Sequence, residues 1–108
     1  MPKISKVRTT LYDSTGVLLG IGGIYTGAGR RCNDFRYIRG TIFADVAGTL
    51  YVEQDADNMN FAIQDTFAVV AGVGLGFKAL CVGRFIRLRY VNGAVAQTVF
   101  RLWSELEP

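Results

Sequence analysis

The sequence contains no histidine, and this absence excludes the commonest nucleophile systems of hydrolytic enzymes. Serine–histidine and cysteine–histidine pairs both need an imidazole as general base. Cysteine is scarce too, because Cys32 and Cys81 lie far apart and neither belongs to a Cys-x-x-Cys pair of the kind found in zinc sites. We therefore expect no enzymatic activity, no metal and no cofactor. The two thiols are interpreted as small buried apolar groups, with a single disulfide as the alternative.

Long hydrophobic runs are also missing. The run VLLGIGGIY at residues 17–25 is interrupted by glycines and is much shorter than the roughly 20 apolar residues of a membrane span. The basic start MPKISKVRTTLYDSTG has no apolar core before a small-residue cleavage site, so no signal peptide is predicted. We expect no membrane association, and a protein that stays in the cytoplasm where it is made or on a particle.

Proline is rare, with two residues against 13 glycines, and charged residues make up only 19% of the chain. Half of the residues are hydrophobic, which is enough for one modest core and excludes a disordered chain. The net charge of +3 is mild, and most of the basic residues are arginines. Arginine favours planar, paired contacts at interfaces more than lysine does. The composition therefore indicates one small domain, rich in turns.

Apolar residues recur with period two in several short segments, whereas no long window shows a helical stripe. This spacing of short strands and turns predicts a single antiparallel β-sandwich or jelly roll of about seven or eight strands. Residues 1–12 are expected to be an N-terminal arm or first strand, and residues 13–108 the sandwich. Strands are predicted at residues 17–25, 35–44, 49–54, 62–70, 77–82 and 85–91, with a turn at 13–16 and a helical turn near 104–106.

Two short segments resemble ligand loops only superficially. GIGGIYTGAGRR lacks the Gly-Lys-Ser/Thr that completes a phosphate-binding loop. DADNMN at residues 55–60 alternates acidic side chains as a calcium loop does, but it lacks glycine at the sixth position and glutamate at the twelfth, which is Thr66. We interpret it as a turn with solvated carboxylates, and a weak calcium site is the alternative.

The segment GRFIRLRYVNGAVAQTVFRLW, residues 83–103, is the most patterned part of the chain and predicts a hairpin around Asn92-Gly93. A two-residue loop would mix arginine with core residues on one face. A three-residue loop, with Gly93 in the left-handed conformation, pairs Tyr90 with Ala94 and separates core from surface, so we favour it. The inner face then carries Ile86, Leu88, Tyr90, Ala96, Thr98, Phe100 and Leu102. The outer face carries Phe85, Arg87, Arg89, Val95, Gln97, Val99 and Arg101.

Three interpretations of this outer face remain open. The first is a sheet face that only contacts water, and the second is a protein–protein contact in which arginine alternates with exposed apolar residues. The third is a surface that binds nucleic acid. The last is the weakest, since the positive excess is small and the aromatic residues Tyr90 and Phe100 are predicted to point inward.

Two stretches suggest a family. GTLYVEQDADNMNF (48–61) and VGRFIRLRYVNGAVAQTVFRLW (82–103) resemble small β-sandwich virion proteins of tailed bacteriophages and, more remotely, discoidin-like carbohydrate-binding sandwiches. The resemblance covers the C-terminal part of the chain. The sequence departs from the pattern at Asn58, where glycine is usual, and at Phe61, where tryptophan is usual.

The resemblance implies a structural role on the virion, as a capsid decoration protein on the capsid surface, assembled in the host cytoplasm. Its partners would be further copies of itself, as a homotrimer, and the major capsid protein. Lys3, Lys6 and Arg8 on the N-terminal arm would lie across an acidic capsid surface, and the outer face around Phe85 would contact a neighbour. The alternative is a glycan-binding module of a phage tail or baseplate.

Overall fold

The computed structural model describes residues 12–108, which form nine strands and, within that range, no helix. The predicted arm at residues 1–12 therefore lies outside the described residues except for Tyr12, which begins the first strand. The strands are β1 (Tyr12–Thr15), β2 (Ile24–Thr26), β3 (Arg30–Arg31), β4 (Tyr37–Ala44), β5 (Gly48–Asp55), β6 (Ala62–Val69), β7 (Leu75–Leu80), β8 (Phe85–Asn92) and β9 (Phe100–Glu107).

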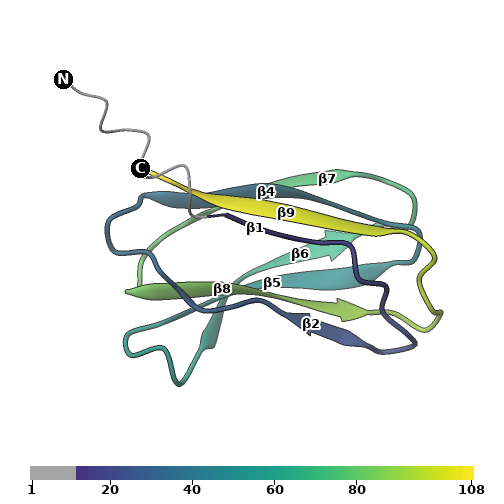
Figure 1. The fold of residues 1–108 in the computed structure, drawn as a ribbon, viewed down its shortest axis with the longest axis horizontal. Coiled ribbons are helices and arrows are strands. Elements are labelled where there is room, and N and C mark those ends of the chain that lie inside the picture. The colour runs from purple at the N-terminus through teal and green to yellow at the C-terminus, as the bar shows by residue number, and fades with distance from the viewer. Residues whose placement is uncertain (1–11) are drawn as a thin grey trace.

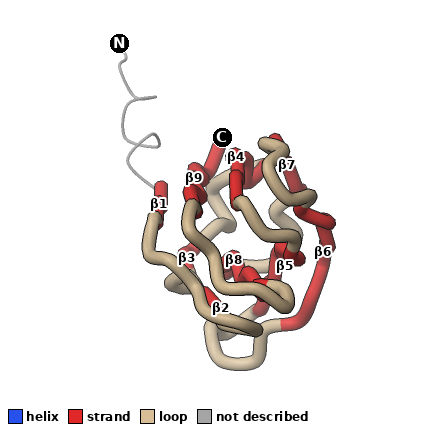
Figure 2. The backbone as a smooth tube through the Cα atoms, turned by 90° about the vertical axis from the view of Figure 1, so that its right-hand side faces the viewer, coloured by secondary structure: helices blue, strands red, loops and turns tan. Residues whose placement is uncertain are grey.

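The strands form two antiparallel sheets that pack face to face (Figures 1 and 2). Sheet A has the order β1-β9-β4-β7, and sheet B has the order β2-β8-β5-β6, with β3 also paired to β8. Because β2 and β3 lie along the same side of β8, they act as one interrupted strand, which leaves eight strand positions. The predicted all-β antiparallel sandwich is confirmed. No helix in the described part of the chain is long and apolar enough to cross a membrane.

The core lies between the sheets and follows the alternation of the sequence. Along β8, Ile86, Leu88 and Tyr90 are buried, and each such side chain contributes roughly 1.5–3 kcal/mol by leaving water. The ring of Tyr90 packs against that of Phe100 on β9, with centroids 5.1 Å apart. Gly48 faces this pair, and a Cβ there would overlap the Tyr90 hydroxyl. The inward set predicted for residues 86–90 is therefore correct.

The predicted hairpin at residues 83–103 is wrong. β8 pairs with β2, β3 and β5 in sheet B, whereas β9 pairs with β1 and β4 in sheet A, so residues 93–99 cross between the sheets. Asn92 is buried in the crossing rather than exposed in a turn, and Gly93 does not adopt the left-handed conformation. Within the crossing, Gln97 is buried and Ala96 and Thr98 are exposed, which reverses the predicted sides.

Three further local predictions are wrong. Residues 13–15 are not a turn but part of β1, which pairs with β9. Residues 104–106 lie inside β9, where Ser104 and Leu106 are buried on alternate positions as in any strand. The strand predicted at residues 17–25 is mainly a loop that joins the edges of the two sheets, and only residues 24–26 are strand. Most of the large apolar side chains in this segment are exposed.

Candidate interaction surfaces

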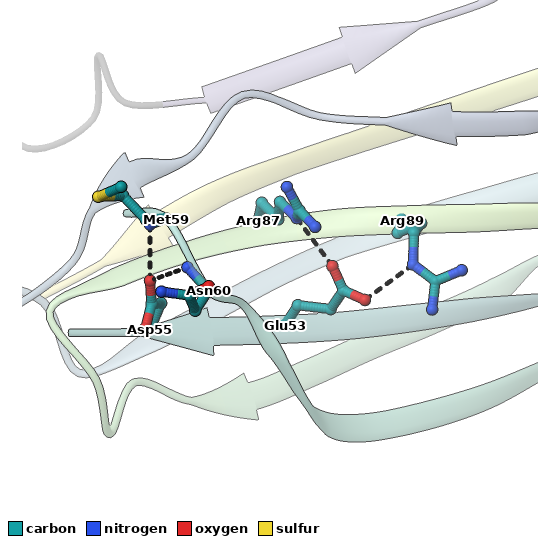
Figure 3. A network of polar contacts seen from close by, with 6 residues as sticks. All are labelled: Glu53, Asp55, Met59, Asn60, Arg87 and Arg89. Carbon is teal, nitrogen blue, oxygen red and sulfur yellow. Dashed lines mark hydrogen bonds and ion pairs between the residues drawn. The ribbon is translucent and has the colours of Figure 1, made fainter. Parts of the chain in front are cut away.

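The outer face of sheet B carries an arginine–glutamate–arginine cluster. Residues 87 and 89 on β8 point away from the core because residues 86, 88 and 90 point into it. Both guanidinium groups converge on Glu53 of β5, with Arg87 Nε 2.8 Å from Oε1 and Arg89 Nε 2.7 Å from Oε2 (Figure 3). The Glu53 carboxylate is thus held by one charge-assisted hydrogen bond to each of its oxygens.

Aromatic rings complete this cluster. The guanidinium of Arg87 lies 4.2 Å from the ring centroid of Phe61, and that of Arg89 lies 4.4 Å from that of Tyr51. The arginine side chains retain 29% and 24% of their exposure, whereas that of Glu53 retains 6%. Both arginines are therefore paired within the chain, and little of their charge is free to bind a phosphate backbone.

The electrostatics of Glu53 follow from this geometry. Burial alone would raise the pKa of the carboxyl, and it is the largest single influence, but the hydrogen bonds and charges of Arg89 and Arg87 together outweigh it. The pKa of Glu53 is therefore below its ordinary value, and the side chain is ionised in the folded protein at neutral pH.

Phe85 begins β8 on the same outer face and is half-buried. It pairs across the strands with Arg31 of β3, whose guanidinium lies 5.7 Å from the ring centroid. Phe85, Arg87 and Arg89 thus share one surface, as the sequence predicted.

Arg101 does not share that surface. It lies on β9 in sheet A, with its guanidinium 5.0 Å from the ring centroid of Phe43 on β4. The predicted grouping of Arg101 with Arg87 and Arg89 is therefore wrong, because it depended on a hairpin that does not form.

The loop between β5 and β6 is closed by Asp55. Its carboxylate accepts hydrogen bonds from the backbone N–H groups of Met59, at 2.7 Å, and of Asn60, at 2.6 Å (Figure 3). A hydrogen bond with Asp57 and these amides hold the pKa of Asp55 below its ordinary value. Asn58 has a positive φ of 63°, a conformation that asparagine tolerates and glycine favours. One carboxylate oxygen of Asp55, Oδ2, therefore holds this turn closed.

The outer face of sheet A presents Trp103, a residue that the sequence analysis did not single out. Trp103 is half-buried, and beside it lies an open depression of about 580 Å³ lined by Thr41, Phe43 and Arg101, among others. A second depression of about 380 Å³ on the same face is also lined by Trp103 and Thr41, together with Arg39. The indole of Trp103 thus lines both depressions. Period-two parity, which places Arg101 outward, also places Trp103 outward, so the signal was present in the sequence.

The crossing at residues 93–99 is tied to the loop before β2. The Asn92 amide donates to the carbonyls of Gly20, at 2.8 Å, and Val95, at 2.9 Å. Leu19 and Gln97 exchange two further hydrogen bonds, both 2.9 Å long, from the Leu19 N–H to the Gln97 side chain and from the Gln97 N–H to the Leu19 carbonyl. Two segments far apart in sequence therefore form one end of the sandwich, at the right of Figure 1.

These joined segments expose large apolar side chains, which we call the end patch. Its members and their exposed fractions are Val17 (72%), Leu18 (52%), Ile21 (75%), Ile24 (56%) and Val95 (61%). Of the predicted contact residues, Val95 belongs to this patch. Val99 is half-buried, and its N–H donates to Asp45 at 3.0 Å. Lys3, Lys6 and Arg8 lie outside the described residues.

The comparisons with known proteins agree with this fold. A family model described as "Uncharacterised protein YqxG N-terminal domain" matches residues 3–107. Among solved structures, the PBSX exported protein XepA is 25% identical over 90% of this chain, with a TM-score of 0.84. This chain spans 37% of the XepA chain. A search of curated proteins finds no match.

Two more distant structures share the fold alone. PirA is 12% identical with a TM-score of 0.60, and the alignment covers 87% of this chain and 93% of PirA. A protein of the Bacillus endospore appendages, described as a novel family of disulfide-linked pili, is 14% identical with a TM-score of 0.54, and the alignment covers 91% of this chain and 88% of that protein.

Proposed function

The chain belongs to the family described as "Uncharacterised protein YqxG N-terminal domain", and we propose that it is a structural virion protein, a capsid decoration protein that binds the assembled capsid as a homo-oligomer. Its partners are then other copies of itself, in a homotrimer, and the major capsid protein. The role requires no catalysis, no membrane and no nucleic acid. The similarity to XepA, which is described as exported, supports a place of action outside the cytoplasm, on a released particle.

The strand order supports this role. With β2 and β3 counted as one position, consecutive strands mostly alternate between the two sheets, and we interpret the order as that of a jelly roll. Jelly rolls are common in viral capsid and lectin domains. Fold alone does not assign function, so the surface has to carry the argument.

The end patch is the observation that carries the proposal. Five large apolar side chains, each more than half exposed, lie on two hydrogen-bonded segments. Exposed apolar side chains gathered in this way mark contact surfaces for other proteins. Their backbones are held in place by Asn92 and Gln97, so the surface is formed before a partner arrives. Symmetric association would also stabilise a small sandwich with a modest core.

Analytical ultracentrifugation of the purified protein tests the proposal, together with co-sedimentation with capsids that lack it. We expect an oligomer that pellets with capsids, and an Ile21→Asp variant that is folded, shifted towards monomer and at least tenfold weaker in capsid binding.

Val82→Asp is the matched control. Val82 is 60% exposed in the loop between β7 and β8, at the other end of the sandwich, so the same charge there should leave both properties unchanged. A wild-type protein that stays monomeric at high concentration and ignores capsids would overturn the proposal.

Glycan binding is the second candidate, and the Trp103 face is the observation that favours it. Sugars stack on exposed aromatic rings flanked by polar and charged side chains, and Trp103 has Thr41, Arg39 and Arg101 beside it. The loop at residues 55–61 is less suitable, because Arg87 lies 4.2 Å from the Phe61 ring centroid, closer than the 5.9 Å between Arg39 and the Trp103 ring centroid.

A glycan array separates the two candidates. If the protein binds glycans, Trp103→Ala abolishes the signal, whereas Phe61→Ala, on the other sheet, preserves it. An array without any selective signal would reject this second function and leave the first unaffected.

A further inference from the structure

The two cysteines, far apart in sequence, lie where the two sheets meet. Cys32 follows β3 of sheet B, and its N–H donates to the carbonyl of Arg84 at 2.7 Å. Cys81 follows β7 of sheet A, and its N–H donates to the carbonyl of Arg36 at 2.8 Å. Each cysteine is therefore fixed by a hydrogen bond to a segment that borders the other.

The side chains meet between these segments. The Cys32 thiol donates to the carbonyl of Gly83 at 3.4 Å, two residues beyond Cys81. The two thiols are also hydrogen-bonded to each other, which lowers the pKa of Cys32 and raises that of Cys81. Both are free thiols, Cys32 fully buried and Cys81 half-buried.

Gln54 holds the backbone around Cys81 in place. Its buried side chain accepts hydrogen bonds from the N–H groups of Val82 and Gly83, both at 2.8 Å, and donates to the carbonyl of Leu80 at 2.8 Å. The Gln54 amide thus holds the backbone on both sides of Cys81.

We propose that Cys32 and Cys81 are a modification site for small disulfide oxidants, which convert the two thiols into an intramolecular disulfide that links sheet A to sheet B. The half-buried Cys81 reacts first: its thiolate attacks one sulfur of the oxidant, forms a mixed disulfide and releases one small thiol. Cys32 then attacks the Cys81 sulfur, and the second small thiol leaves. Two protein thiols are oxidised and one oxidant disulfide is reduced to two thiols, so atoms and electrons balance.

The division of roles follows from exposure and acidity. Cys81 is the half-buried thiol and is reached first by an oxidant, and the first step quickens as the pH rises because the thiolate is the nucleophile. Cys32 is shielded from the oxidant, but its thiol lies within hydrogen-bonding reach of the Cys81 side chain that it must attack. The proposal does not depend on capsid binding, because it uses a different end of the sandwich.

Oxidised glutathione is the probe. Incubation of the folded wild-type protein should remove both titratable thiols and lower the mass by two hydrogens, with no glutathione retained. Cys32→Ser should stop at a single glutathione adduct on Cys81, which peptide mapping locates. Cys81→Ser should remain unmodified, since the remaining thiol is buried.

Stability gives a second, independent measurement. Closing a loop of this length is expected to lower the population of the unfolded state by about 100-fold or more, seen as a higher urea midpoint of the oxidised protein than of the reduced one. Circular dichroism confirms that each variant is folded, and the wild-type result stands even if Cys32→Ser does not fold. Wild-type protein that keeps both thiols in excess oxidant, or that accumulates a stable glutathione adduct, would overturn the proposal.

Discussion

At the scale of single residues, Glu53 has the largest effect on the surface chemistry. One carboxylate fixes two arginines, and these two arginines cover two aromatic rings. A side chain that is nearly excluded from water organises an entire outer face. The arginine pattern in the sequence therefore reflects an internal network as well as a surface.

Glu53→Gln should lower the free energy of unfolding by about 2 kcal/mol at pH 7, because the arginines lose a buried counter-charge. The pKa of Glu53 is depressed in the folded state. The stabilisation that ionised Glu53 provides is therefore complete above its pKa in the unfolded chain, about 4.3. It is lost as the pH falls through its lower pKa in the folded protein. Urea titrations of both proteins should show the difference at pH 7 and a smaller one at pH 3. Glu105→Gln is the control, since its partner Arg39 is 49% exposed and the change should cost less than about 1 kcal/mol.

Two substitutions on opposite faces of β8 compare the core with the outer surface. Leu88 is 5% exposed, so Leu88→Asp should cost more than about 4 kcal/mol and leave little folded protein. Phe85 is half-buried on the outer face of sheet B, at the end away from the end patch, so Phe85→Asp should stay folded and leave assembly unchanged. Thermal melts and sedimentation of the two variants measure both effects. Equal loss of folding in both would contradict the placement of Phe85 on the outer face.

At the scale of elements, the crossing at residues 93–99 determines how the sheets connect. Asn92 ends β8 and holds Gly20 and Val95 through its amide. A hairpin would place this side chain in solvent. In the structure it is buried and connects the loop before β2 to the crossing at residues 93–99.

Asn92→Ala should destabilise the protein by about 2–3 kcal/mol, because it removes the hydrogen bonds that the buried amide donates to the carbonyls of Gly20 and Val95. Hydrogen exchange should accelerate mainly at residues 17–24 and 93–99, since both segments lose their shared anchor. Asn60→Ala is a suitable control, because that side chain is exposed in the loop between β5 and β6. Uniform acceleration across all strands would mean that Asn92 does not act locally.

What the sequence predicts at this scale is strand location and parity. The inward positions 86, 88, 90, 100 and 102 were correct because alternation is a local property that burial enforces. The connection was wrong because Asn-Gly is also a local signal, and nothing in residues 83–103 reveals that Asn92 bonds to Gly20. Trp103 was missed for a related reason: its outward parity was visible, but its neighbours Thr41 and Phe43 come from another strand.

At the scale of the whole molecule, the topology is dominated by contacts between distant segments. In the described chain, β5 and β6 are the only consecutive strands that pair with each other. Every other pairing must close a longer stretch of chain before it gains a contact, and this is costly in entropy.

Refolding from urea should therefore be slow for a domain of this size, in the range of about milliseconds to seconds. Trp103 is the sole tryptophan, so stopped-flow fluorescence reports on the assembly of sheet A.

Substitution of Gly48 by alanine, which would collide with Tyr90 in the core, should speed unfolding and weaken the folded state. A microsecond refolding phase that accounts for the full amplitude would contradict the expected dependence on distant pairing.

The pairing of β1 with β9 places Tyr12 opposite Glu105, so the described chain enters and leaves the sandwich at one corner (Figure 1). A reporter or affinity handle fused after Pro108 would project from that corner, away from Ile21 and its apolar neighbours. Fusion proteins could thus be used in every binding assay without obstructing the surface that those assays are designed to probe.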